Sequence, residues 1–432
     1  MKQSWKRSFG ILLIATLLSK LVGFLREIVI ASKFGVSNEF DILLTVFVVP
    51  NMIISLLLYA IPHIVIPRLD LREKSNSNFY TVFSKQFFWP YIIFLIAILI
   101  IYNIFFTVYI KYFPTSEFID HIQLVSNLTI IFSFFVFFSS LFNILKAVYN
   151  AKERFVLPAF TPLLIHFSVI FFVMFLYEEH GVYSFAYGLL VGAILQIGVF
   201  VWDLTQKKNL VFLKPALQPN HLDLSSYVII ILIEFLGQSY TLIDRSFIQQ
   251  LPSGHVSSMY YAGILNNLPV TILGLTFGTV FFPKITLYVQ EKRFEVLWKF
   301  LKKGLILAFT VAIPFTLFFM IFGKEIIILM FERGAFTRDA SVITSGYLSA
   351  LSIGLPFIFI HILLAKICFA FHVEKILLTS TFLAILLKIA LSHYFVGNLF
   401  YWGLSLSTSI SFLVNVLVLC ILLYKNKAQM VK

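Results

Sequence analysis

Charged side chains within long apolar segments are the residues of this sequence that could do chemistry. Lys20 stands near the middle of the apolar segment 8–31. Gly23 and Glu27 follow three and seven residues later, so a helix would place them on the same face as the lysine. An ionisable group inside a membrane costs on the order of 3 kcal/mol and commonly faces a cavity or a partner. We therefore expect a functional face here. The alternatives are a Lys20–Glu27 ion pair that joins helices and a lysine that extends to the membrane surface.

The next charged pair brackets a short loop. Arg26 and Asp41 stand on either side of the segment 32–39. The two charges could form a salt bridge that holds this loop, or they could contact a bound substrate. Both interpretations stay open for these two residues.

A second set of ionisable groups lies in the C-terminal half of the chain. Glu234 is near the middle of the apolar segment 225–250, and Arg245 lies on the same helical face three turns later. Asp244 adjoins this arginine, and Lys388 stands alone in a later apolar segment. We expect these groups to line a substrate or ion pathway.

Motifs of enzymes and of metal sites do not occur in the sequence. It contains no Cys/His metal spacing, G-x-S-x-G, Walker loop or H-E-x-x-H. We therefore expect no enzymatic activity, no cofactor and no metal. Isolated histidines and cysteines of the apolar segments are expected to be packing residues: His63, His166, His361, Cys368 and Cys420.

The elements that must position these groups are membrane helices. Of the 432 residues, 60% are apolar and 12% are charged, and mean hydropathy is +0.94. Soluble domains are nearer 45–50% apolar and about 25% charged, so a soluble globule, a disordered chain and a disulfide scaffold are excluded. Apolar stretches fall at 8–31, 40–67, 87–110, 119–149, 155–177, 182–204, 225–250, 255–283, 297–322, 341–370, 376–396 and 401–424. The sequence predicts an all-α polytopic membrane protein with about 12 transmembrane helices.

The net charge of +13 follows membrane topology. With the N-terminus inside, cytoplasmic segments carry 23 of the 33 lysines and arginines, and outer segments carry seven. The positive-inside rule then places both termini in the cytoplasm. We expect no nucleic-acid partner.

An internal repeat divides the chain. An arginine is followed by a glycine nine residues later and by a proline after fifteen more. The two copies are Arg26, Gly35, Pro50 and Arg245, Gly254, Pro269. We expect lobes over 1–210 and 211–432, each of six helices. Because six is even, the repeats are parallel, as in transporters that alternate access around a central cavity.

A set of short runs spread over the chain is typical of one family. The runs are Ser19–Glu27, Phe34-Gly35, Asp41, Pro50-Asn51, Asn150-Ala151, Arg154-Phe155, Pro158-Ala159, Tyr260–Ala262 and Phe331–Thr337. Together they resemble the MurJ (MviN) lipid II flippases of the multidrug/oligosaccharidyl-lipid/polysaccharide exporter superfamily. The resemblance implies transport of a lipid-linked saccharide to the outer leaflet of the bacterial cytoplasmic membrane, for peptidoglycan synthesis and cell shape. Membrane lipid and envelope-synthesis proteins are the implied partners, and we expect a monomer.

The sequence departs from this family at several cationic positions. The family has arginine where Lys20 stands and keeps the arginine at Arg26. Its further arginines are replaced by uncharged residues: Ile54, Ser55, Gly263 and Ile264 occupy those regions. A lysine lacks the bidentate phosphate contact of an arginine, so we expect a substrate that is held by fewer phosphate contacts or that has a bulkier apolar part. The family's two additional C-terminal helices are also expected to be missing.

The resemblance further implies a cation site in the C-terminal lobe. Asp244 and Thr408 match two sodium ligands of some family members, whereas Lys388 stands where they have Asn and Ser392 where they have Asp. These exchanges add about two positive charges, which disfavours a bound cation. We expect the Lys388 ammonium to replace the ion and to pair with Asp244. The alternative is that Lys388 faces elsewhere.

Two functions follow as hypotheses. The first is a flippase for a polyprenyl-pyrophosphate-linked saccharide, with the pyrophosphate held by Lys20 and Arg26. Further substrate contacts are expected from Asp41, Glu234 and Arg245. The alternative is a cation-coupled small-molecule or drug exporter of the same superfamily, which would use acidic groups.

Overall fold

The computed structural model describes residues 5–65, 83, 87–112, 119–152, 154–206, 225–276, 280–398 and 401–426. It separates into two units. The N-terminal unit comprises residues 1–34 and 42–231, and the C-terminal unit comprises residues 35–41 and 232–432. The short segment between the first two helices therefore groups with the C-terminal unit. The expected lobe boundary at 210/211 lies outside the described residues.

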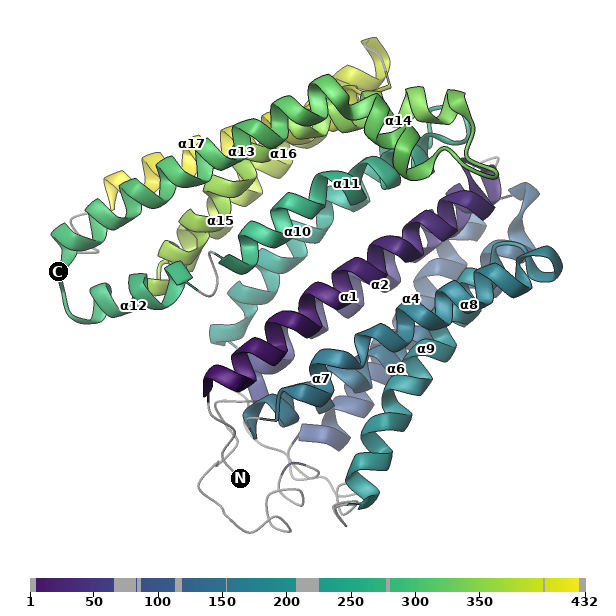
Figure 1. Cartoon of the computed structure of the whole chain (residues 1–432), viewed down its shortest axis with the longest axis horizontal. Coiled ribbons are helices and arrows are strands. Elements are labelled where there is room, and N and C mark those ends of the chain that lie inside the picture. The colour runs from purple at the N-terminus through teal and green to yellow at the C-terminus, as the bar shows by residue number, and fades with distance from the viewer. Residues whose placement is uncertain are drawn as a thin grey trace. The chain divides into compact units, whose positions relative to one another are not determined.

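Helices make up nearly all of the described chain (Figure 1). Those of the N-terminal unit are α1 (Trp5–Phe34), α2 (Asn38–Val65), α4 (Trp89–Tyr112), α6 (Ile122–Ala151), α7 (Val156–Phe160), α8 (Pro162–His180) and α9 (Tyr183–Gln206). The C-terminal unit includes the first residues of α2, up to Asp41, and the part of α10 (Ser225–Ile248) that follows residue 231. It continues with α11 (His255–Thr276), α12 (Phe282–Gln290), α13 (Phe294–Phe331), α14 (Arg338–Ser352), α15 (Leu355–Ala370), α16 (Glu374–Asn398) and α17 (Gly403–Lys425).

The predicted all-α polytopic class is confirmed. Each of the twelve apolar segments is occupied by helix, and the segments 155–177 and 341–370 each hold two consecutive helices. Within the described chain, eight helices are long and apolar enough to cross a membrane, and the pair α14–α15, bent by 45°, raises this to nine. Helices satisfy their own backbone hydrogen bonds, which hydrocarbon requires. Their outward faces carry large apolar side chains such as Phe175 and Leu329, each 67% exposed, as lipid contact requires.

Small residues bring α8 and α9 together in the N-terminal unit. Gly188 and Gly192 are one turn apart on α9. A Cβ on either would lie 2.7 or 2.6 Å from the Cα of Val169 or Ile165 on α8. Without those side chains the two backbones approach closely, which is how small-xxx-small motifs join membrane helices. This packing fixes the α8–α9 junction, which carries several polar side chains.

The internal repeat has a backbone counterpart in both of its copies. Gly35 and Gly254, the paired glycines, have φ of +55° and +93°, a region that favours glycine. A Cβ on Gly35 would collide with the carbonyl oxygen of Ala335. The paired prolines, Pro50 and Pro269, each lie inside the helix that follows the turn.

Candidate functional site

The predicted basic residues of α1 differ in their surroundings. Lys20 is exposed. Arg26 lies about 9 Å further along the helix and is largely buried, with 18% of its side chain accessible. Its Nε donates to Oε1 of Glu27 at 3.0 Å, and a second guanidinium nitrogen also contacts that oxygen. Glu27 therefore pairs with its neighbour Arg26 and orients the guanidinium.

His166 of α8 joins this face of α1. Its Nε2 is 3.4 Å from the hydroxyl of Ser19, and a Cβ added to Gly23 would lie 3.3 Å from its ring. The contact with Ser19 agrees with the expected hydrogen-bonded packing role. Its buried Nδ1 has no hydrogen-bond partner among the described residues. Gly23, which shares the helical face of Lys20, leaves the space that the His166 ring occupies.

Asp41 caps the N-terminus of α11. It is 3% exposed. The Gly254 N–H donates to Oδ2, and the Ser257 N–H donates to Oδ1 at 2.7 Å. A carboxylate at this place satisfies donors that a helix start leaves unpaired and complements the helix dipole. Both oxygens of Asp41 thus hold the 35–41 segment onto α11, and its substrate contact stays a prediction.

Arg245 reaches the same helix end. Its Nη1 donates to the carbonyl of Val256 at 3.0 Å, and its charge attracts the Asp41 carboxylate. Its buried Nε has no hydrogen-bond partner among the described residues. The structure therefore brings two predicted site residues, Asp41 and Arg245, together around the start of α11 within the C-terminal unit.

Glu234 stands apart from this group. It lies about 15 Å along α10 from Asp244, is half-buried, and accepts a hydrogen bond from Gln238 Nε2 at 2.9 Å. This contact spans one helical turn within α10.

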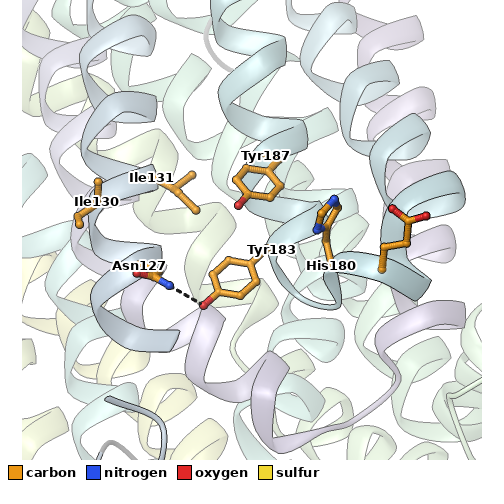
Figure 2. A pocket seen from close by; sticks show the side chains of 7 residues that line it. Asn127, Ile130, Ile131, His180, Tyr183 and Tyr187 are labelled. Atoms are coloured by element: carbon orange, nitrogen blue, oxygen red, sulfur yellow. Dashed lines mark hydrogen bonds between the residues drawn. The ribbon is translucent and has the colours of Figure 1, made fainter. Parts of the chain in front are cut away.

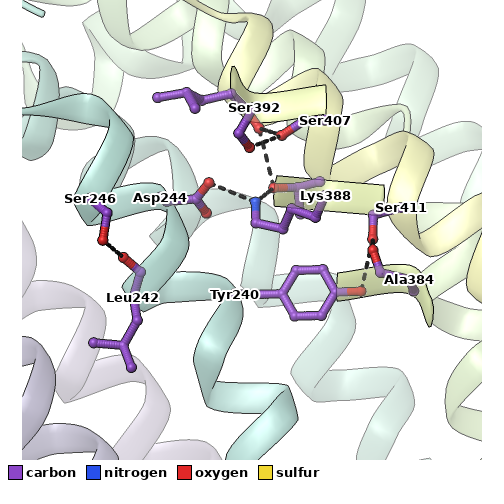
Figure 3. A network of polar contacts seen from close by, with 11 residues as sticks. Tyr240, Leu242, Asp244, Ser246, Ala384, Lys388, Ser392, Ser407 and Ser411 are labelled. Carbon is purple, nitrogen blue, oxygen red and sulfur yellow. Dashed lines mark hydrogen bonds and ion pairs between the residues drawn. The ribbon is translucent and has the colours of Figure 1, made fainter. Parts of the chain in front are cut away.

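The strongest polar cluster of the C-terminal unit surrounds Lys388 of α16 (Figure 3). Its side chain is fully buried, and Nζ donates to Oδ1 of Asp244 at 2.6 Å and to the hydroxyl of Thr408. The ring of Tyr240 lies 5.4 Å from Nζ, within range of a cation–π contact. The predicted pairing of Lys388 with Asp244 is thus present.

A second layer of hydroxyls supports this cluster. Ser392 and Ser407 are 2.9 Å apart through their Oγ atoms, and the Tyr240 hydroxyl is 3.0 Å from that of Ser411 (Figure 3). The ammonium therefore occupies a polar pocket whose lining atoms would otherwise suit a cation. Within the part of the chain that the structure describes, no cluster of three or more His, Cys, Asp or Glu side chains could hold a metal ion.

A carboxylate in the loop after α13 shows a separate electrostatic effect. Glu332, after α13, accepts a hydrogen bond from the Ser341 hydroxyl at 2.7 Å and pairs with Arg338 at 3.3 Å. The Ser341 hydrogen bond and the Arg338 charge lower the pKa of Glu332 below its ordinary value of 4.5. These contacts close the loop that contains the 331–337 run.

Comparison with known proteins decides the family. A family model described as lipid II flippase MurJ matches residues 30–432. The chain belongs to the MurJ family. This family comprises transporters, and its helical multi-pass architecture agrees with the apolar spans described above.

Relatives and solved structures extend the match. The chain is 28% identical to a protein of Buchnera aphidicola subsp. Acyrthosiphon pisum named "Probable lipid II flippase MurJ", over 95% of this chain and 82% of that one. It is 26% identical to the lipid II flippase MurJ of Burkholderia cenocepacia, over 95% and 82%. A lipid II flippase MurJ structure in an inward closed conformation aligns with TM-score 0.78 at 23% identity, over 96% and 87%. An inward-facing multidrug resistance MATE transporter aligns with TM-score 0.73 at 13% identity, over 95% and 94%. These structural likenesses show the fold.

The uncharged residues that stand in the regions of the family's further arginines lie on α2 and α11. Ile54 of α2 is partly buried and packs against the apolar core of the N-terminal unit, which includes Val136 and Phe142. Ser55 on the same helix is half-buried, as are Gly263 and Ile264 on α11. An uncharged side chain at 54 therefore fits its packing, because an arginine there would have to leave the core or find a partner.

Proposed function

We propose that the chain is a flippase for a polyprenyl-pyrophosphate-linked saccharide, lipid II or a closely similar envelope precursor. It moves the headgroup from the inner to the outer leaflet by alternating access. The family match over residues 30–432 carries this proposal. The chemistry is consistent with it, because an anionic headgroup does not cross about 30 Å of hydrocarbon unaided and needs fixed positive partners on its route.

Lys20 and Arg26 are the proposed pyrophosphate ligands of α1. Lys20 supplies an exposed ammonium, and Arg26 is oriented by the buried Glu27, which limits the entropy lost on binding. His166 lies against the same helix and offers a further polar atom. In the C-terminal unit, the unpaired Nε of Arg245 is the corresponding donor.

Lys388 is the proposed substitute for a coupling ion. Its ammonium already neutralises Asp244 and satisfies Thr408. A cation entering this site would meet a fixed positive charge at a few ångströms, which is strongly unfavourable in a buried environment. Transport by this chain therefore proceeds without sodium.

The membrane orientation is also part of the proposal. The bias of lysines and arginines places both termini on the cytoplasmic side of the bacterial inner membrane. Lipid-linked saccharide and membrane lipid are the partners, and the working unit is a monomer that cooperates with envelope-synthesis proteins.

Rescue of a bacterial strain depleted of its lipid II flippase tests the function. The parent chain is expected to restore growth, and Lys20→Ala and Arg26→Ala to abolish rescue at unchanged membrane levels. Lys20→Arg should retain it. Lys33→Ala is the matched control, because Lys33 lies on the same helix in an exposed pair with Glu178 that contributes little.

Failure of the parent to rescue, with normal insertion, contradicts lipid II as the substrate. In that case Ile264→Arg is the informative variant. It returns a positive charge to a half-buried position of α11 and should shift activity toward lipid II. Full rescue by a Lys20→Ala/Arg26→Ala double variant contradicts the pyrophosphate assignment.

A cation-coupled exporter of small molecules is the second candidate. One observation favours it: Glu234 is a half-buried carboxylate on α10, and it accepts a hydrogen bond from Gln238. Efflux of a cationic dye that is lost in Glu234→Gln would support this function over the first.

A further inference from the structure

A groove of about 550 Å³ opens on the N-terminal unit between α6 and the α8–α9 junction (Figure 2). Its size falls within the range of small-molecule sites. Asn127 contributes from α6, and Glu179 and His180 from the end of α8. Tyr183 and Tyr187 contribute from the first turns of α9. None of these residues belongs to the basic face of α1 or to the network around Lys388.

Two tyrosines form one wall of the groove. Tyr183 and Tyr187 are one turn apart on α9, their ring planes differ by 24°, and their centroids are 6.1 Å apart. Figure 2 shows the flat faces of both rings turned the same way. Nδ2 of Asn127 donates to the Tyr183 hydroxyl at 3.2 Å and fixes that ring. The result is a flat aromatic platform of two rings.

Polar groups surround this platform. The ring of His180 stands nearly perpendicular to Tyr187, at 88° with centroids 5.8 Å apart. Glu179 adds a carboxylate to the lining, and the amide oxygen and nitrogen of Asn127 add an acceptor and donors. A flat aromatic face beside donors and acceptors suits a ligand with one C–H face and hydroxyl groups on its rim.

The chemistry selects a sugar ring over other ligands. The negative π faces of the tyrosines attract the partly positive C–H face of a pyranose, and its hydroxyls match Asn127, Glu179 and His180. A phosphate would be repelled by the Glu179 carboxylate. A quaternary ammonium is bound best by rings set around it as a cage, whereas Tyr183 and Tyr187 are nearly parallel.

We propose that this groove is a saccharide-binding site for the sugar portion of the transported lipid. The inference rests on the proposed flippase function. With the termini inside, the α8–α9 junction lies at the outer surface, so the groove would hold the sugar after the headgroup has crossed. Tyrosines at a membrane interface also anchor helices, and the experiment separates that role from sugar binding.

Saturation-transfer NMR on the full chain in lipid nanodiscs is the test, with N,N′-diacetylchitobiose as the probe. Saturation is expected to reach the sugar ring protons, with weak binding near the millimolar range. Tyr187→Ala should weaken binding about tenfold, which corresponds to about 1.4 kcal/mol and lies at the upper end of what an aromatic contact contributes. Tyr187→Phe keeps the ring and should stay within about twofold of the parent.

Tyr424→Ala is the matched control, because Tyr424 at the end of α17 is 80% exposed and outside the groove. It should bind the probe as the parent does. Absent transfer to the disaccharide, equal binding by Tyr187→Ala, or choline chloride displacing the disaccharide would each overturn the saccharide assignment. Rescue of a flippase-depleted strain without disaccharide binding overturns the saccharide assignment of the groove and leaves the proposed flippase function standing. Disaccharide binding without rescue supports the saccharide site in the groove and overturns lipid II as the transported substrate.

Discussion

Removing the charge of Lys388 should destabilise the C-terminal unit by several kcal/mol. The side chain of Lys388 is fully buried, its Nζ is 2.6 Å from Asp244, and Asp244 keeps only 13% exposure. Breaking a buried ion pair by deleting one partner costs about 3–5 kcal/mol, because the other charge is left without compensation. Lys388→Met is the sharpest variant, since it keeps a long unbranched stem and removes only the ammonium. We expect a loss near 3 kcal/mol, because Asp244 is not entirely sealed from solvent.

A double-mutant cycle measures the pair itself. Lys388→Met, Asp244→Asn and the combined variant would be compared by apparent melting temperature in detergent and by rescue of a flippase-depleted strain. The combined variant should recover part of the stability lost by Lys388→Met, because no buried charge remains. Lys366→Ala is the control: this lysine of α15 lies 5.5 Å from the ring of Phe282, a contact of about 0.5–1 kcal/mol. Additive losses in the cycle would refute the coupling between Lys388 and Asp244.

The same site predicts a change in ion dependence. Lys388→Asn replaces the ammonium with an amide oxygen beside the Asp244 carboxylate and the Thr408 hydroxyl. Oxygen ligands of this kind suit hard cations. The parent should melt and function alike with sodium or with choline as the cation, whereas Lys388→Asn should become more stable in sodium. A parent whose transport requires sodium would rule out the tethered-cation interpretation.

Three further predictions concern packing, capping and pH. Gly192→Leu should destabilise the N-terminal unit by about 1–3 kcal/mol through overpacking against α8, whereas Gly198→Leu on the same helix should change the melting temperature little, since nothing lies within 4 Å of its Cβ position. Asp41→Ala should cost about 1–2 kcal/mol of stability by leaving the α11 cap unmade, visible as faster amide hydrogen exchange at the start of that helix; unchanged exchange would contradict the cap. The pKa of Glu332 is lower in the folded protein than its ordinary value of 4.5, so its contribution is present above about pH 4.5 and is lost as the pH falls through the folded pKa. Ser341→Ala should therefore flatten the acid side of a melting-temperature profile, and an identical profile would refute the hydrogen bond's role.

Much of the architecture was predictable because it depends on patterns along the chain. Uninterrupted apolar runs must form helices in hydrocarbon, and the described helices occupy all twelve expected segments. The repeated glycine, Gly35 and Gly254, could also be recognised in the sequence, because a turn that needs positive φ favours glycine in each copy of the repeat. Lys388 was singled out as an intramembrane charge, and the resemblance to the family's cation site made Asp244 its expected partner.

The pairing of the other polar groups could not be predicted, because it depends on distances between segments and the sequence does not give those distances. Glu27 pairs with Arg26, where spacing had also allowed Lys20. Asp41 uses both oxygens on α11, more than 200 positions away in the chain. The platform of Tyr183 and Tyr187 could not be predicted from the sequence. Two tyrosines at the start of a helix line a groove only where a second helix, here α6, lies beside them. Hydropathy and charge along the chain determined which segments enter the membrane. Only the tertiary structure decided which polar groups meet there, because hydrogen bonds and ion pairs act over a few ångströms and those distances are set by helix packing.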